Sequence, residues 1–369
     1  MKQLRHTLRF RGAKLQRFST HALCTQFGVT PRGSVSSLLR SAGPFVASRD
    51  AYRFTNSDHG GWAITKNDAQ ILRERYQGLI EVVMPVGIAA VRHSLEALRF
   101  PGIGGLPAVA IALVIDEITE ALRNELLDKM VSAVPGRYGR CGGMAFSAYD
   151  FFLIGWPVDV FSMQPASGEL RQYIWTRLMD SIELNGVQFL EWIMILHILP
   201  VISRLASVSL AAVAAGSIVG PGGAVIAALL AGKKDILSLG GPSALRDRTK
   251  EHLLEVAKRL KDAACWPVGL VYGDSSNPVD QHQVLAIGYQ DLGDGRTQLN
   301  IWDNNDGPMC RNLLVDTTGT ELSVTSSKGK ILNVKGLICE GYRVAIPPNS
   351  LRFPNRGNLT TEWNLNVCV

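Results

Sequence analysis

The sequence of 369 residues has few charged side chains: 19% are Asp, Glu, Lys or Arg, against 46% hydrophobic residues. This balance excludes general disorder and leaves room for two domains, or for one large domain with attachments. The six cysteines form no Cys-x-x-Cys pair, so we expect no metal site and no cofactor. A chain of this length needs no disulfide framework, which favours a reducing compartment.

Acidic residues are absent from the first 49 positions, which carry nine Lys or Arg, and Asp50 is the first acid. The rest of the chain has 38 − 9 = 29 basic and 32 acidic residues, so the net charge of +6 comes from this leader and we expect no nucleic-acid binding. No apolar run follows the early charges, which excludes an ordinary secretory signal. Two interpretations of residues 1–49 stay open: an organelle-targeting leader, or a basic arm that is solvated or touches a membrane.

Charge is also absent between Leu205 and Gly232, within an apolar segment at 193–232 whose single charged residue is Arg204. That length is sufficient to cross a bilayer. However, Pro221-Gly222-Gly223 would break one spanning helix into two short helices. The segment is therefore either a buried helical hairpin or substrate lid, or a membrane-inserted or closely packed pair of helices.

A cysteine lies between glycines at the start of a helical pattern, in the sequence Gly-Arg-Cys-Gly-Gly-Met at 139–144. Apolar residues at steps of three and four from Met144 predict a helix whose first turn contains Cys141. A helix N-terminus and a nearby imidazolium lower the pKa of a thiol, which favours a nucleophilic thiolate over a merely buried cysteine. Gly142 and Gly143 leave backbone N–H groups open to bind an oxyanion.

A histidine begins the strand-like run 282–289, and it follows the cysteine by 282 − 141 = 141 residues. Cys–His spacings of ~130–150 residues are typical of papain-type thiol enzymes. His282 is therefore the predicted general base. The other six histidines precede the motif, or lie in the apolar segment or on a predicted helix: His6, His21, His59, His93, His197 and His252.

A cluster of acids and amides follows a predicted return strand at 297–303. A four-residue loop at 291–294 sets Asp303 directly opposite His282, whereas a two-residue Asp294-Gly295 loop sets it opposite Ala286. The chemistry favours the longer loop, because Asp303 can then orient the imidazole and stabilise its protonated form. The reserve orienters are Asn304, Asn305 and Asp306, which could instead only shape a turn.

The order of helical patterns before strand-like runs predicts an α+β fold. The expected helices lie at 116–130, 168–184 and 242–264, and the further expected strands at 266–272, 331–334 and 342–346. The predicted organisation is a basic leader at 1–49, a mainly helical N-terminal region at 50–135, a catalytic domain at 136–350 and a tail at 351–369.

Three motifs resemble the papain-like cysteine peptidase superfamily, and more closely a group of poorly characterised papain-fold proteins. They are Cys-Gly-Gly-Met at 141–144, His-Gln-Val-x-Ala-x-Gly-Tyr at 282–289 and Trp-Asp-x-Asn at 302–305, and the likeness extends over 136–348. The resemblance implies a papain-like fold, in which a central N-terminal catalytic helix packs on an antiparallel β-sheet. It also implies that Cys141 is the nucleophile, His282 the base and Asp303 the orienter.

Papain has a glutamine six residues before its cysteine that completes the oxyanion hole, and Pro135 stands at that position here. The second oxyanion donor is thus unassigned, with Gln283 or a backbone N–H as candidates.

The first functional hypothesis is a thiol hydrolase that cleaves a peptide or isopeptide bond in a protein or peptide substrate through an acyl-enzyme. The same three residues could run acyl transfer, deamidation or transglutamination, because only the second nucleophile differs. A different class is a membrane-targeted toxin or effector that uses the leader and 193–232 to reach a bilayer. A third alternative is an inactive papain-fold binding module.

Overall fold

A computed structural model describes residues 43–57, 62–96, 120, 123–124, 137–198, 242–274 and 280–352, all within one compact unit at 41–369. The predicted helix at 116–130 lies almost entirely outside these residues, and so does the apolar segment beyond residue 198. None of the helices in the described ranges is both long and apolar enough to span a membrane.

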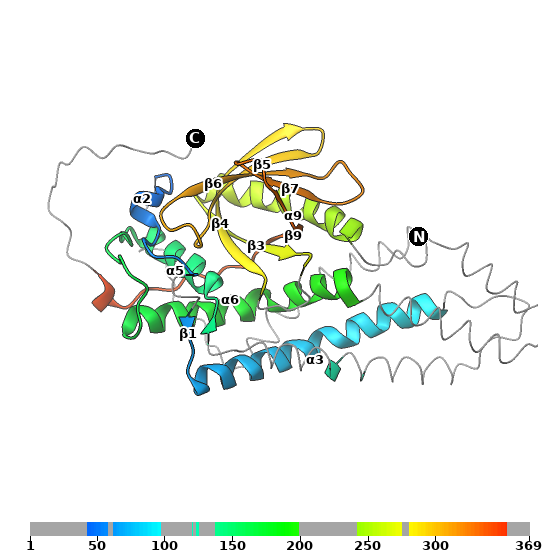
Figure 1. Cartoon of the computed structure of the whole chain (residues 1–369), viewed down its shortest axis with the longest axis horizontal. Coiled ribbons are helices and arrows are strands. Elements are labelled where there is room, and N and C mark those ends of the chain that lie inside the picture. Colours follow the sequence, from blue (N-terminus) through cyan, green and yellow to red (C-terminus); the bar gives the residue numbers. More distant parts are fainter. Residues whose placement is uncertain are drawn as a thin grey trace, which may run out of the picture. The chain divides into compact units, whose positions relative to one another are not determined.

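The described part of the chain contains five α-helices and two short helical turns (Figure 1). The α-helices are α2 (Ala47–Asp50), α3 (Lys66–Glu96), α5 (Cys141–Ile154), α6 (Glu169–Ile193) and α9 (Pro242–Asp262). The short turns are η2 (Met194–Ile198), which continues α6, and η4 (Asn349–Leu351). The predicted helix after Met144 therefore begins at Cys141, and those predicted at 168–184 and 242–264 correspond to α6 and α9.

The strands of the described residues form a two-stranded ladder and a curled antiparallel sheet of seven strands in the order β8-β7-β6-β5-β4-β3-β9. The ladder is β1 (Trp62–Ala63) with β2 (Arg137–Tyr138). The sheet contains β3 (Trp266–Tyr272), β4 (His282–Gly293), β5 (Arg296–Trp302), β6 (Cys310–Asp316), β7 (Ser323–Ser326), β8 (Ile331–Leu332) and β9 (Val334–Cys339). Mixed helix and antiparallel sheet is the predicted α+β class.

The prediction of a strand at 342–346 is wrong. This segment has no regular structure and instead packs against α5 and α6. The backbone N–H of Ala345 and the hydroxyl of Tyr342 both donate to the buried carboxylate of Asp150, and the carbonyl of Arg343 accepts from Arg177. The alternating apolar pattern at 342–346 thus reflects contacts with helices rather than with a neighbouring strand.

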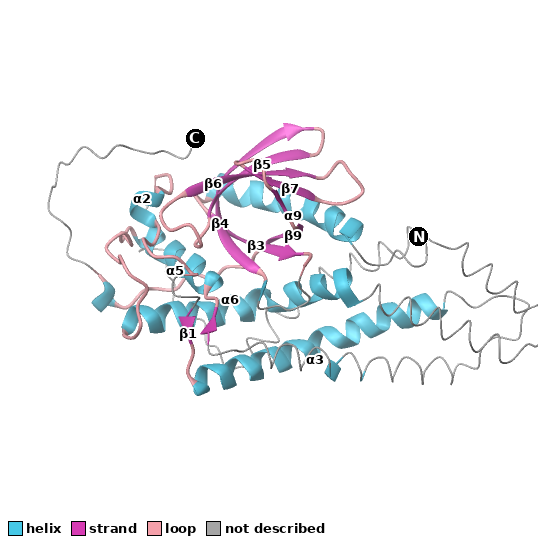
Figure 2. Ribbon diagram, in the orientation of Figure 1, coloured by secondary structure: helices cyan, strands magenta, loops and turns pink. Residues whose placement is uncertain are grey.

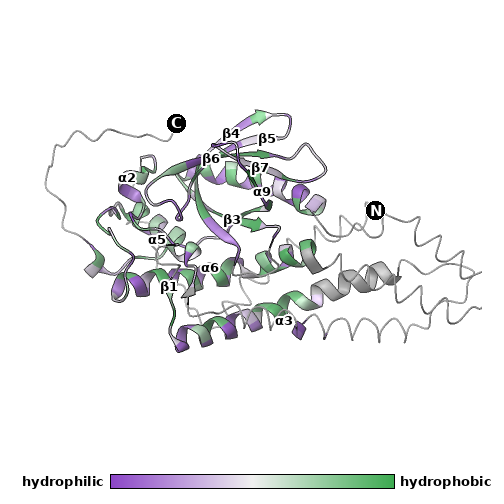
Figure 3. Ribbon diagram, in the orientation of Figure 1, coloured by the Kyte–Doolittle hydropathy of each residue, from purple (hydrophilic) through white to green (hydrophobic). Residues whose placement is uncertain are grey.

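Helices cover both faces of the sheet (Figure 2). Leu253 and Val256 of α9 pack in one hydrophobic cluster with residues of β3 to β7 and β9. Charged residues fill the other side of α9, so hydrophilic and hydrophobic colours alternate along it (Figure 3). The opposite face, where Leu285 and Trp302 project, packs against α5. Side chains of successive residues in β4 point to opposite faces, and both faces are covered along its first five residues, 282–286, which are all buried.

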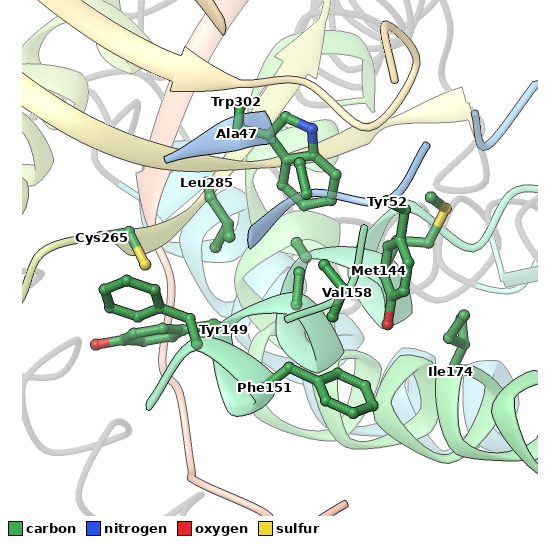
Figure 4. Packing of buried hydrophobic residues seen from close by; sticks show 14 of the residues in the cluster. Ala47, Tyr52, Met144, Tyr149, Phe151, Val158, Ile174, Cys265, Leu285 and Trp302 are labelled. Atoms are coloured by element: carbon green, nitrogen blue, oxygen red, sulfur yellow. The ribbon is translucent and has the colours of Figure 1, made fainter. Parts of the chain in front are cut away.

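Helix α5 is buried around its whole circumference, because α6 and the sheet enclose it (Figure 4). Residues far earlier in the chain join its core: Tyr52 lies in the same cluster as Met144 and donates to or accepts from the Ser147 hydroxyl at 2.9 Å. Residues 45–54 and Trp62 therefore pack with the predicted catalytic domain.

The turn between β4 and β5 is the shorter of the two alternatives, so the four-residue loop is wrong. Gly293 pairs with Arg296, and the two residues between them, Asp294 and Gly295, both have positive φ, of 49° and 73°. This is the favoured geometry for a two-residue Asp-Gly hairpin. Two irregularities in the ladder then shift the register, so that Leu285 pairs with Trp302 at the far end. Asp303 follows the last paired residue.

The cysteines are not all alike. Cys141, Cys265 and Cys339 are free and buried. Cys310, at the start of β6, is disulfide-bonded.

Candidate active site

Cys141 is the first residue of α5 and is 9% exposed. The first bond of the helix runs from the N–H of Met144 to the carbonyl of Arg140 at 2.8 Å. The N–H groups of residues 141–143 precede that bond and have no acceptor within their own helix, so they are available to an oxygen atom near the sulfur. The thiol itself points toward the carbonyl of Gln281, 4.0 Å away.

His282 begins β4 next to this thiol and is paired with Asp303. The imidazole Nε2 lies 2.7 Å from Asp303 Oδ1, and both residues are largely buried. Burial lowers the pKa of His282, but the hydrogen bond and charge of Asp303, and the hydrogen bond and charge of Cys141, raise it to about 10. Because Nε2 faces Asp303, Nδ1 is the ring nitrogen that this pair leaves free. The imidazole is thus protonated at neutral pH and bridges a carboxylate and a thiol.

A tight turn after β5 holds Asp303 in place. The carboxylate accepts from the backbone N–H of Asn305 at 2.9 Å, and the carbonyl of Asp303 accepts from the N–H of Asp306, also at 2.9 Å. Burial raises the pKa of Asp303. His282, the Asn305 N–H and the charge of Arg311 lower this pKa by a larger amount, so the net shift is downward. The carboxylate is therefore an anion whose position is fixed by the backbone.

Asn304 connects α5 to β4. Its side-chain Nδ2 donates to the carbonyl of Cys141 at 3.1 Å and to the carbonyl of Gln283 at 2.8 Å, and the residue is fully buried. The reserve orienter Asn304 thus faces the backbone on both sides of the site rather than the imidazole. Asn305 is exposed, and its Nδ2 lies 3.3 Å from His282 Nε2.

The structure reveals Asn56 as a site residue that sequence reasoning missed. Its side-chain Oδ1 accepts from the N–H of Arg140 at 2.6 Å, and its own N–H donates to the carbonyl of Asn304 at 2.8 Å. Asn56 thereby connects the residue before Cys141 to the turn that carries Asp303. It lies outside the three motifs and 85 positions before Cys141 (141 − 56), and no local pattern marks it.

Gln283, a predicted oxyanion donor, is part of a buried polar network. Its Nε2 donates to Ser181 Oγ at 2.7 Å and to Glu340 Oε1 at 2.6 Å. Burial raises the pKa of Glu340 to about 8, although the Gln283 hydrogen bond and the charge of His282 lower it. Both amide hydrogens of Gln283 are consequently directed into the protein interior.

The two glycines after Cys141 are required by close packing. A Cβ added to Gly142 would lie 1.6 Å from Gln283 Oε1, and one added to Gly143 would lie 2.1 Å from the backbone carbonyl of Ile174. Any larger residue at either position would force α5 away from β4 or α6. From the sequence, these glycines are explained by open backbone N–H groups for an oxyanion. The close packing is a second, independent reason why only glycine fits at both positions.

The structure thus brings together Cys141, His282 and Asp303, with Gly142, Gly143 and Gln283 beside them. Within the described ranges, no group of three or more His, Cys, Asp or Glu side chains is arranged to hold a metal ion. Comparison of the chain with protein-family models, with curated proteins and with solved structures found no match.

Proposed function

We propose that the protein is a papain-like thiol hydrolase that cleaves a peptide or isopeptide bond through an acyl-enzyme on Cys141. The observation that carries the proposal is the chain of contacts from a buried thiol at a helix N-terminus, through His282, to Asp303 Oδ1 at 2.7 Å. A nucleophile, a base and an orienting carboxylate in contact are the parts that covalent acyl transfer needs. The packing of α5 on an antiparallel sheet supports the papain-like form of the α+β fold.

In the proposed reaction, the Cys141 thiolate attacks the carbonyl carbon of the substrate, and the new negative charge moves to the carbonyl oxygen. The free N–H groups at the start of α5 stabilise this oxyanion. The His282 imidazolium then gives its proton to the leaving nitrogen, and the amine departs. Water attacks the thioester while His282 takes its proton, which releases the acid and restores the thiolate.

Asp303 has two tasks in this scheme. It holds the imidazole with Nε2 toward itself and Nδ1 toward the sulfur, and its charge stabilises the imidazolium that shares the site with the thiolate. An amine or a glutamine side chain in place of water or of the peptide would give acyl transfer, transglutamination or deamidation on the same three residues, so these reactions remain alternatives. The membrane-directed alternative depends on residues outside the described ranges.

The proposal is tested by labelling the full chain with iodoacetamide and locating the modified cysteine by mass spectrometry. We expect fast labelling of Cys141, lost in Cys141→Ala and reduced at least tenfold in His282→Ala. Cys265 provides the matched control, since burial raises its pKa well above the ordinary value and Cys265→Ala should leave the labelling unchanged. Equal labelling of Cys141 and Cys265 would contradict the proposal, and cleavage of a peptide library by wild type but not by Cys141→Ala would identify the bond.

A further inference from the structure

The proposed reaction needs a second hydrogen-bond donor for the oxyanion besides the backbone at the start of α5. The glutamine that serves papain-like enzymes is replaced by Pro135. Gln283 does not fill the gap, because both of its amide hydrogens are engaged by Ser181 and Glu340. A donor from another part of the site must do so if the oxyanion is held at two points.

Asn56 is a side-chain amide bound to the backbone directly before the nucleophile. Its Oδ1 accepts from the N–H of Arg140 at 2.6 Å, and Arg140 is covalently joined to Cys141. Its own N–H donates to the carbonyl of Asn304 at 2.8 Å, and Asn304 Nδ2 in turn donates to the carbonyl of Cys141 at 3.1 Å. Asn56 is thus connected to Cys141 along two paths, which fix its position beside the start of α5.

These contacts use the oxygen and the backbone of Asn56 but leave its side-chain nitrogen without a partner. In the part of the chain that the structure describes, no acceptor binds either hydrogen of Nδ2. Because Oδ1 accepts from Arg140, the amide cannot exchange its two ends without losing that bond. Nor is Nδ2 sealed from solvent, unlike the unpartnered Nε of Arg140. Asn56 therefore presents a free donor whose orientation is set by a bond to the backbone.

Gly139 leaves this donor uncovered. A Cβ added to Gly139 would lie 3.3 Å from Asn56 Nδ2, so this nitrogen lies against the backbone two residues before Cys141. Gly139 is only half-buried. A side chain at position 139 would crowd Nδ2, whereas glycine leaves it open to a substrate oxygen.

We infer that Asn56 Nδ2 is the second donor to the oxyanion that forms when Cys141 attacks a substrate carbonyl. This inference rests on the proposed function. As the carbon–sulfur bond forms, the electron pair of the carbonyl π bond moves to the oxygen, which accepts from the Cys141 N–H and from Asn56 Nδ2. Asn56 keeps both of its hydrogens throughout, and the leaving group takes its proton from His282. A neutral amide suits this task because it donates without itself being charged.

The inference is tested with two reactions of the same thiol in the full chain. Acetylation by p-nitrophenyl acetate passes through an oxyanion, whereas alkylation by iodoacetamide displaces iodide and forms none. The measured quantity is the ratio of the acetylation rate to the alkylation rate, in which changes of thiol reactivity common to both reactions cancel. We expect this ratio to fall about 100-fold in Asn56→Ala, the usual cost of an oxyanion donor.

A second variant separates the donor from the connecting role of Asn56. Asn56→Asp keeps an oxygen that accepts from the Arg140 N–H but has no side-chain N–H, so the ratio should fall in this variant as well. Asn185→Ala is the matched control, because Asn185 is also buried and its Oδ1 and Nδ2 both bind the backbone of Gly341. It should keep the ratio within about threefold of wild type.

The possible outcomes distinguish the inference from the proposed function. A ratio within about threefold of wild type in Asn56→Ala or in Asn56→Asp would overturn the inference and leave the proposed function standing. Equal losses of both rates give that unchanged ratio and would show only a structural role for Asn56. A fall in Asn185→Ala as large as in Asn56→Ala would also overturn the inference, because loosened packing would then explain the ratio. Acetylation of wild type no faster than of Cys141→Ala would instead refute the proposed function.

Discussion

Replacing Asp303 by asparagine should deprotonate His282 at neutral pH. The asparagine would keep the size of the side chain and a hydrogen-bond acceptor for Nε2, but it would remove the negative charge. In the wild type this charge opposes burial and, with Cys141, raises the pKa of His282 to about 10. Burial would remain in the variant and disfavours the charged imidazole.

The size of the effect follows from the wild-type pKa. The difference between about 10 and the ordinary 6.5 corresponds to about 5 kcal/mol of stabilisation of the imidazolium, at about 1.4 kcal/mol per pH unit. With most of this removed and the burial penalty kept, the pKa of His282 in Asp303→Asn should fall to 6.5 or below. The imidazole would then be neutral at pH 7.5, where the wild-type imidazole is charged.

The shift can be followed by ¹⁵N NMR of the histidine side chains during a pH titration. His252 serves as an internal reference, because burial and the charge of Arg248 lower its pKa to about 4 and it lies on α9. Its titration should be the same in both proteins. If the pKa of His282 in Asp303→Asn stayed within one unit of the wild-type value, the assignment of Asp303 as its charged partner would be refuted.

The same shift has a consequence for folding stability. The folded-state pKa of His282 lies above the unfolded value, so its contribution is fully present below pH 6.5 and is lost as the pH rises through 10. Urea unfolding should therefore give wild type a higher free energy of unfolding than Asp303→Asn at pH 6. The difference should be much smaller at pH 10. An advantage that is constant with pH would contradict the linkage.

Three further predictions concern the surroundings of the site. The folded-state pKa of Glu340 is raised to about 8, so wild type loses stability as the pH rises from about 4.5 to 8. The free energy of unfolding of Glu340→Gln should therefore rise relative to that of wild type by about 1.4 kcal/mol per pH unit over this range. A difference in urea unfolding that does not change with pH would argue against this. Gly142→Ala should destabilise by at least about 2 kcal/mol in thermal unfolding, since its Cβ would lie 1.6 Å from Gln283, whereas Gly78→Ala, with nothing within 4 Å, should stabilise by about 0.5–1 kcal/mol. Asn304→Ala should lower the free energy of unfolding by about 1–3 kcal/mol and slow the labelling of Cys141, because two buried carbonyls lose their donor. The control is Asn305→Ala at an exposed position, which should lower the free energy of unfolding by less than about 1 kcal/mol. Equal losses in the two variants would refute the connecting role of Asn304.

The sequence predicted those site residues whose signal is local. Cys141 lies at a change from glycine to helical periodicity, His282 begins a strand pattern, and Asp303 ends one. Each is recognisable from its immediate neighbours, and a single spacing connects the first two. The class of the fold was predictable for the same reason, because most of the helices and strands have regular apolar patterns.

The register of β4 and β5 was not predictable in this way. The Asp294-Gly295 signal correctly indicates a two-residue turn, but a constant register from that turn sets Asp303 opposite Ala286. Irregularities near Gly288 and Gly293 shift the pairing, so the contact with His282 forms with the short turn. A bulge depends on how the strand packs against both faces of the sheet, and that information is not local.

Residues that act through distant contacts were missed for a related reason. Asn56 reaches the site because residues 45–54 pack in one cluster with α5. No neighbouring residue marks it, since its contacts depend on which segments meet. The sequence separated residues 50–135 from the predicted catalytic domain, and this division hid its contribution.

The two buried carboxyls around His282 explain why the imidazole has one charged partner rather than two. Hydrogen bonding and the charge of the imidazolium outweigh burial at Asp303 and keep its pKa low, whereas burial prevails at Glu340 and raises its pKa to about 8. Were both anionic at neutral pH, their combined charge would hold the proton on His282 more tightly and slow its transfer to a leaving group. Carboxyls whose pKa values are pushed apart by their surroundings take different roles, so in the proposed reaction Asp303 serves as the charged orienter while Glu340 is the neutral support of Gln283.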